Sequence, residues 1–254
     1  MSLPAELRNK IYELALHDPV GHHIKAQTRL NRHVAQRISV QEFKSLNTGY
    51  RIRNGRQWQQ VLSALHQQTV TSATTKEDPV YVPLTPVLVA VSKDIYNEAI
   101  MYLYRNPIVC VDTQSLHSFL TLIGPKHRSL LRDVELAEWG YTATQKALNF
   151  PAISLLADAV KLERLSLKIS PESSAVSIAK KIYRDCHIFL DAYGAAKGDR
   201  FAAVDIIDLA EGCLVNRVFN LTPGRFEHVS EEKLQAGFES FKVHLKQELS
   251  YRGF

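Results

Sequence analysis

Few cysteines, no long apolar run and no familiar catalytic motif are the first features of this sequence of 254 residues. Cys110, Cys186 and Cys213 are too few and too scattered for a disulfide framework, and each lies in an apolar stretch. We expect buried free thiols and a reducing compartment, the cytoplasm or the nucleus. Because no apolar run approaches membrane-spanning length and charges interrupt the first apolar pattern, we expect neither a membrane partner nor a secretory signal.

The common signatures of enzymes are also missing. No Gly-rich phosphate loop, nucleophile elbow or His-Glu-x-x-His pattern occurs, and the pair His22 and His23 lacks zinc-site spacing. Asp205 and Asp208 fall in an expected strand, where their odd separation points the two carboxylates to opposite faces. We therefore predict a non-enzymatic protein with no cofactor and no metal. An enzyme whose site is assembled from dispersed residues is the less favoured alternative.

Acidic residues are nearly missing from one part of the chain. Between Pro19 and Lys76 there are nine lysines and arginines but a single acid, Glu42, so this segment carries a charge of +8. The whole chain carries +5, which leaves −3 for the remainder. The basic character therefore belongs to one segment and not to the protein as a whole.

This basic segment supports a hypothesis of nucleic-acid binding over residues 22–58. Phosphate neutralisation needs many cations, few acids and side chains that can stack, such as His33 and Trp58. In a helix, Arg29 and Arg32 would share a face. The alternatives are a solvated insertion, cations paired with carboxylates elsewhere in the chain, or an acidic protein partner. The candidate cations are Lys25, Arg29, Arg32, Arg37, Arg51, Arg53 and Arg56.

Apolar periodicity predicts the remaining elements. Leu3, Leu7, Ile11 and Leu14 share one face of a first helix, and a second strong helix covers residues 87–104. Further helices are expected over 56–68, from Thr113 to Gly124, from Pro151 to Val160, from Val176 to Tyr193 and from Ser230 onward, and short strands at 108–112, 132–138, 163–169 and 203–210.

Strands that alternate with helices imply parallel pairing through right-handed crossovers. We predict an α/β fold with two parts. Residues 1–104 form an N-terminal helical subdomain that carries the basic segment 19–79 as an insertion. Residues 105–254 form an irregular leucine-rich-repeat-like βα sheet that ends in a C-terminal helix.

Three blocks of sequence resemble the F-box-like proteins of filamentous fungi. LPAELRNKIYELAL (3–16) is similar to their opening block, VLVAVSKDIYNEAIMYLYRNPIVCVD (87–112) to their second block, and SFLTLIGPKHRSLLRDVEL (118–136) to their third. The resemblance implies an F-box-like helical subdomain that binds a Skp-family adaptor of a cullin ubiquitin ligase. It also implies a repeat-like C-terminal region that holds a substrate protein.

Two surfaces are therefore candidates for partner binding. By the resemblance, one face of the first helix meets the adaptor, through Leu3, Pro4, Leu7, Ile11 and Leu14. The alternative is that this face packs against the helix at 87–104. A second partner surface is expected on the exposed face of the parallel strands, where polar side chains line up: Glu135, Ser166, Lys168 and Asp205.

The function that these observations favour is a non-enzymatic F-box-like protein-interaction module, such as a substrate receptor of a cullin ubiquitin ligase. Nucleic-acid binding by the basic segment is the alternative. The identity of the partner protein does not follow from the sequence.

Overall fold

The computed structural model describes residues 3–18, 20–29, 32–47, 86–140, 143–169, 174–210, 213–214 and 231–251. The helix predicted over 56–68 and three candidate cations, Arg51, Arg53 and Arg56, lie outside these ranges. Within them, α-helices alternate with the strands of one β-sheet, so the predicted α/β class is confirmed.

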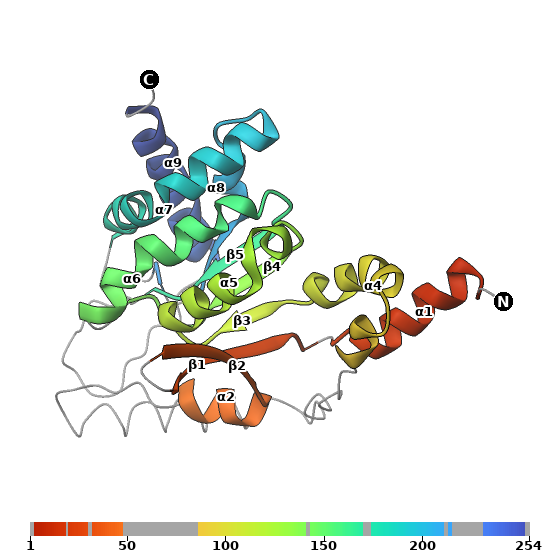
Figure 1. The fold of residues 1–254 in the computed structure, drawn as a ribbon. Coiled ribbons are helices and arrows are strands. Elements are labelled where there is room, and N and C mark those ends of the chain that lie inside the picture. The colour runs from red at the N-terminus through yellow and green to blue at the C-terminus, as the bar shows by residue number, and fades with distance from the viewer. Residues whose placement is uncertain are drawn as a thin grey trace.

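The sheet has six strands in the order β2-β1-β3-β4-β5-β6 (Figure 1). β1 pairs antiparallel with β2, and all other neighbouring strands are parallel. From β4 onward, each strand lies next to the strand that precedes it in the sequence, so the connecting helices fall on one face of the sheet. The strands are β1 (His22–Arg29), β2 (Arg32–Ile38), β3 (Ile108–Cys110), β4 (Asp133–Leu136), β5 (Arg164–Leu167) and β6 (Ile207–Leu209).

Helices α5 (Thr113–Arg128), α6 (Ala143–Ser154) and α7 (Ala175–Lys197) form the layer over that face (Figure 1). Their apolar side chains and the inward-facing residues of the strands make up the main core. The last helix, α9 (Glu231–Tyr251), packs on α7 and contributes Phe241 to the same core. The core thus depends on long-range contacts between the sheet and a single layer of helices.

Capping residues fix where several helices begin. Ser92 caps α4 (Lys93–Arg105) and Asp112 caps α5, each by accepting a hydrogen bond from a backbone N–H in the first turn. The predicted end at Gly124-Pro125 is a kink, because Gly124 has a φ of 71° that glycine tolerates best. One more turn then continues to the end of α5. A short 3-10 helix, η1 (Pro86–Ala90), precedes α4.

Two predicted boundaries are wrong. Residues 203–210 were expected to form one strand, but α8 (Ala202–Ile206) occupies their first half, where alanines favour a helix, and β6 begins only at Ile207. The helix expected from Pro151 already begins at Ala143. It continues into a 3-10 turn, η2 (Leu155–Asp158).

The predicted basic insertion contains part of the sheet. β1 and β2 pair with each other as an antiparallel hairpin, and β1 pairs in parallel with β3 through His22–Ile24. The sheet therefore includes residues on both sides of the predicted division between the two parts. Arg29 and Arg32 lie opposite each other on paired strands, so the expectation that they share a helical face is wrong. Helix α2 (Val40–Asn47) follows the hairpin (Figure 1).

Asn106, the residue after α4, joins three segments of the chain, and its side chain is fully buried. Its Nδ2 donates to the Leu16 carbonyl oxygen at 2.7 Å and lies 3.1 Å from Nε2 of His22. Its Oδ1 accepts from the backbone N–H of Asp18 at 2.9 Å. One amide thus holds the end of α1 (Ala5–Leu16), the end of α4 and the start of β1 together.

The buried imidazole of His22 is part of this junction. The pKa of His22 is lowered from 6.5 to about 4, first by burial and then by the nearby Arg37 guanidinium. The neutral ring can accept a hydrogen bond from Asn106 at Nε2, whereas the imidazolium cannot. Between these two pKa values, the unfolded chain binds a proton that the folded chain does not, so acid opposes folding.

We predict that Asn106→Ala lowers the free energy of unfolding by about 3 kcal/mol, because it leaves the buried Leu16 carbonyl and the Asp18 N–H without their partner. Urea denaturation measures the change. Asn97→Ala, on the exposed side of α4, is the control and should change stability by less than about 0.5 kcal/mol. A loss below about 1 kcal/mol for Asn106→Ala would contradict this role of the amide.

We also predict that His22 makes the fold sensitive to acid. The stability contributed by neutral His22 is complete above pH 6.5 and is lost as the pH falls through about 4, with a slope of up to about 1.4 kcal/mol per pH unit. In His22→Gln, whose amide oxygen can still accept from Asn106, this part of the pH dependence should vanish. Urea denaturation of both proteins across this range tests the idea, and parallel curves would rule it out.

Candidate protein-interaction site

Helix α1 packs against α4 through its polar and aromatic side. Nε of Arg8 lies 2.9 Å from Oε2 of Glu98, and the Tyr12 hydroxyl donates to the same carboxylate at 3.1 Å. The Tyr12 ring lies against that of Tyr102, with centroids 5.8 Å apart, and Leu16 is fully buried. Together these contacts fix the rotation of α1 about its own axis.

The row of apolar residues predicted on the first helix is consequently exposed. Leu3, Leu7, Ile11 and Leu14 are 52%, 53%, 43% and 68% exposed, respectively. The prediction that this face packs against the helix at 87–104 is therefore wrong, although the two helices do contact each other. Pro4, at the N-cap of α1, is exposed beside this row.

An exposed row of this kind has the character of a protein-binding surface. Single exposed leucines are ordinary, but four large apolar side chains spaced about one helical turn apart form a continuous stripe. Burial of each one against a partner would contribute about 1.5–3 kcal/mol before the cost of association. The opposite charges of Lys10 and Glu13, whose side chains pair at 3.1 Å on the same helix, keep the surroundings polar.

Two cations of the hairpin, in contrast, pair with carboxylates of the chain. Nη2 of Arg37 lies 2.6 Å from Oδ2 of Asp18, whose side chain is only 3% exposed. Nζ of Lys25 lies 3.2 Å from Oε1 of Glu42 in α2. The alternative in which cations pair with carboxylates elsewhere in the chain is therefore confirmed for Arg37, whereas Lys25 pairs with the one acid of the basic segment itself. Arg32 is exposed near the end of the hairpin.

The predicted row of polar residues on the strands is present in part, although Ser166 within it is buried. Glu135 and Ser166 are paired in register on β4 and β5, and Lys168 follows β5 directly. Asp205 does not join them, because it belongs to α8. Asp208 of β6 stands next to Ser166 instead. Neither Asp208 nor its neighbour Arg164 was predicted for this surface, although strand alternation places Arg164 and Ser166 on the same face.

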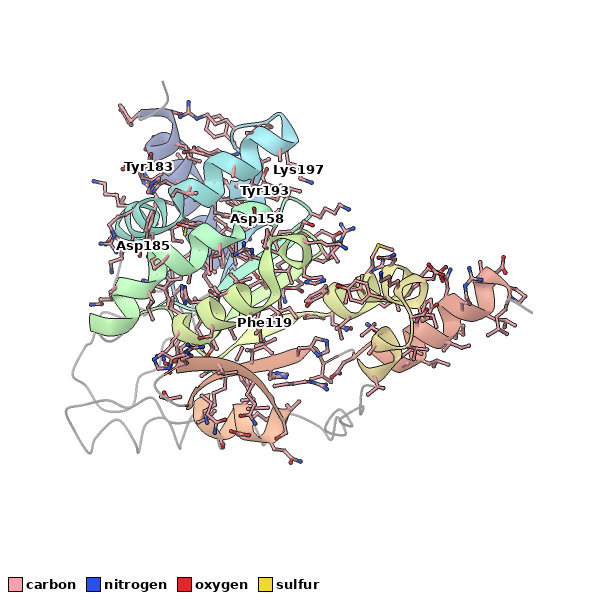
Figure 2. The ribbon with its side chains drawn as sticks, in the orientation of Figure 1. Phe119, Asp158, Tyr183, Asp185, Tyr193 and Lys197 are labelled. Carbon is pink, nitrogen blue, oxygen red and sulfur yellow. The ribbon has the colours of Figure 1, made fainter. Side chains whose placement is uncertain are left out.

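Several titratable and nucleophilic groups in the described ranges are buried or bonded to other residues. In the part of the chain that the structure describes, no group of three His, Cys, Asp or Glu residues is arranged to hold a metal ion. The three cysteines are buried free thiols, as predicted, and burial raises the pKa of each. Asp185, labelled in Figure 2, lies in α7, and its carboxylate accepts hydrogen bonds from Asn149 of α6 and from its neighbour Arg184. The bond from Asn149 joins α6 to α7.

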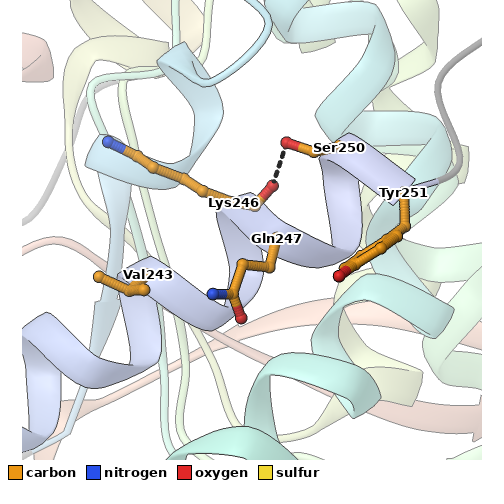
Figure 3. A pocket seen from close by; sticks show the side chains of 5 residues that line it. All are labelled: Val243, Lys246, Gln247, Ser250 and Tyr251. Carbon is orange, nitrogen blue, oxygen red and sulfur yellow. Dashed lines mark hydrogen bonds between the residues drawn. The ribbon is translucent and has the colours of Figure 1, made fainter.

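An open pocket on α9 offers little chemistry (Figure 3). The Ser250 hydroxyl donates to the Lys246 carbonyl oxygen at 2.9 Å, so it is engaged within its own helix. Among the lining residues that the structure describes there is neither a carboxylate nor an imidazole to act as a base. The lining residues are Val243, Lys246, Gln247, Ser250 and Tyr251.

Comparison with known proteins gives one match. A family model described as "Domain of unknown function (DUF7730)" matches residues 1–149, more than half of the chain. That range contains α1, the hairpin, the Asn106 junction and β4. No curated protein and no solved structure matches the chain. None of the helices in the described ranges is both long enough and apolar enough to cross a membrane.

We predict that Arg37 stabilises the fold through its ion pair. Arg37→Gln should lower the free energy of unfolding by about 3 kcal/mol, because it leaves the buried Asp18 carboxylate without its cation. Asp18→Asn in the same background should recover part of that loss, as a double-mutant cycle would show. Arg32→Gln, on the exposed strand, is the matched control. Equal small effects of the two arginine substitutions would contradict the prediction.

Proposed function

We propose that this chain, which belongs to the family of the domain of unknown function DUF7730, is a non-enzymatic F-box-like interaction protein. The observation that carries the proposal is the exposed apolar face of α1, which we call the α1 face: Leu3, Leu7, Ile11 and Leu14. Helix α4 packs against the opposite side of α1, so the α1 face is held in one orientation and is accessible to a partner. Pre-organisation of this kind lowers the entropy cost of binding.

The partner that the sequence blocks favour is a Skp-family adaptor. An amphipathic helix binds such a protein by laying its apolar side in a groove, with contacts that recur every three to four residues. The α1 face has this spacing. In this proposal the βα sheet is the leucine-rich-repeat-like part that carries the substrate protein, and the complex acts in the cytoplasm or the nucleus.

Contacts of α4 explain how the face is kept outward. A rotation of α1 that buried Leu7 or Leu14 would pull Tyr12 and Arg8 away from Glu98 and expose Leu16. Such a rotation would lose an ion pair, a hydrogen bond and the burial of a large side chain. The apolar face is therefore exposed because α1 packs against α4 through Arg8, Tyr12 and Leu16 instead.

The nucleic-acid alternative has less support. Of its candidate cations, Lys25 and Arg37 are paired with carboxylates, which reduces the charge available to phosphates. Arg32 is exposed, and three others lie outside the described ranges. The alternative stays a prediction, for which a steep salt dependence of oligonucleotide affinity would be the signature.

We predict that Leu14→Asp abolishes capture of a purified Skp-family adaptor by the full chain, or weakens it at least about tenfold, because it places a charge in the apolar contact. Leu122→Asp on α5 is the matched control, since Leu14 and Leu122 are both 68% exposed. Biolayer interferometry with immobilised adaptor gives the affinities, and circular dichroism confirms that both variants fold. Unchanged binding by Leu14→Asp, or no binding by the unmodified chain, would exclude this partner.

A further inference from the structure

Helices α1, η1 and α4 form a lobe with a small core of its own. Tyr12, Leu16 and Ala99 are the buried residues of this core, and the partly buried side chains around them also come from α1, η1 and α4. Among the described residues, no side chain of this small core belongs to the main core of the sheet. Figure 1 shows the lobe beyond the ends of β1 and β3, away from α6 and α7. We call these three helices the α1–α4 lobe.

Within the described ranges, the chain connects the α1–α4 lobe to the sheet at two neighbouring places. One connection runs from α1 to β1 and the other from α4 to β3, and these two strands are paired. The connections also touch: the backbone N–H of His22 donates to the Pro107 carbonyl oxygen at 2.7 Å, and a Cβ atom on Gly21 would lie 2.6 Å from that oxygen. Gly21 has a φ of 84°, which other residues rarely adopt. Two adjacent connections of this kind define one axis, which is the arrangement of a hinge.

Two side-chain contacts between the lobe and the sheet lie at this hinge. Asp18 pairs with Arg37 of β2, and Nδ2 of Asn106 lies 3.1 Å from Nε2 of His22. The other hydrogen bonds of the Asn106 amide join residues 16–18 to the last turn of α4, so they stay within the lobe. Turning the lobe about the hinge would therefore keep these bonds.

A contact farther from the hinge sets the angle of the lobe. His127, in the last turn of α5, lies between two tyrosines of α4. Its ring stacks on that of Tyr104, with centroids 5.2 Å apart, and its Nε2 meets the Tyr96 hydroxyl. Tyr96 lies in the first turn of α4, about 15 Å along the helix from Asn106 at 1.5 Å per residue. We call Tyr96, Tyr104 and His127 the latch.

The hydrogen bonds of His127 determine how the latch is made. Its Nδ1 lies 2.7 Å from the Ile123 carbonyl oxygen, which can only accept, so Nδ1 carries the proton. In the neutral ring Nε2 is then an acceptor, and the Tyr96 hydroxyl donates to it. Nζ of Lys126 also lies over the Tyr96 ring, 5.7 Å from its centroid. Two neighbouring side chains of α5 thus hold one tyrosine of α4.

We propose that the α1–α4 lobe turns as one body about the hinge at Gly21 and Pro107, and that the latch holds it in the orientation seen here. A unit with its own core can turn without unfolding when a small interface joins it to its neighbour. Among the residues that the structure describes, Tyr104 is the one residue of the lobe that packs against the main core. A hinge needs only a few residues at the ends of elements to absorb the change in backbone angles.

The hinge decides where the α1 face points relative to the sheet. Under the function proposed above, this angle sets the distance between the adaptor and a substrate protein on the sheet, so the use of the hinge rests on that function. Motion of the lobe itself does not depend on which partner binds. A failed adaptor assay and a failed test of the hinge are therefore separate results.

Double electron–electron resonance tests the proposal, with one spin label on α1 at Asn9→Cys and one on α7 at Lys180→Cys, both exposed positions. The three native cysteines are buried, so the labels attach to the introduced thiols. With the latch intact, the distance distribution should be single and narrow. His127→Ala should widen it at least about twofold, because the latch no longer opposes motion about the hinge. A distribution that stays narrow in His127→Ala, or one that is already wide before the substitution, would overturn the proposal.

Further variants separate a moving lobe from a loosened fold. Tyr96→Phe keeps the ring but removes the hydroxyl that donates to His127, and should widen the distribution less than His127→Ala does. His244→Ala is the matched control, because His244 bonds within its own helix, α9, and it should have no effect. A label pair on α5 and α7, at Leu122→Cys and Lys180→Cys, should keep its distance in every variant. Equal widening by His244→Ala, or a change in the α5–α7 pair, would refute the hinge.

Discussion

The hydrogen bonds of one buried amide, that of Asn106, are the constraint on which the arrangement of this protein depends. They connect the last turn of α1 to the end of α4 and to the first residue of β1. An amide can serve all three because it has two donors and a carbonyl acceptor. The result is that a helix at the beginning of the chain, a helix from its middle and the first strand of the sheet meet at a single point. The C-terminal end of α1 is fixed in place by this junction.

The exposure of the α1 face is a consequence of this junction and of one carboxylate. Glu98 receives both Arg8 and Tyr12, which lie one turn apart on α1, and Leu16 continues the same side toward Asn106. When this side of α1 packs against α4, the leucines on the opposite side of the helix are left exposed to solvent. A protein that binds no partner would gain little from four exposed apolar side chains in line, and for this reason we propose an interaction protein.

The sheet separates the charges of the chain in space. Its hairpin edge contains cations from the basic segment, part of which are neutralised by Asp18 and Glu42, whereas β4 to β6 present carboxylates around a single arginine. The strict succession of strands from β3 to β6 keeps the helices on one face and leaves the polar row on the other. The polar row on those strands is thus a result of topology as much as of composition.

Local patterns in the sequence determined the alternation of helices and strands, the strands that begin near 108, 133 and 164, the kink at Gly124 and the burial of the three cysteines. These features depend on periodicity and on single residues that the chain presents within one element. Tertiary structure alone decided which side of α1 is buried, that β1 pairs with both β2 and β3, and that Asp208, not Asp205, joins Ser166. Two apolar or aromatic stripes were available on α1, and the choice between them was made by Glu98, 90 residues away from Arg8. Contacts over such separations leave no periodic signal in the sequence, because they depend on how whole elements pack together.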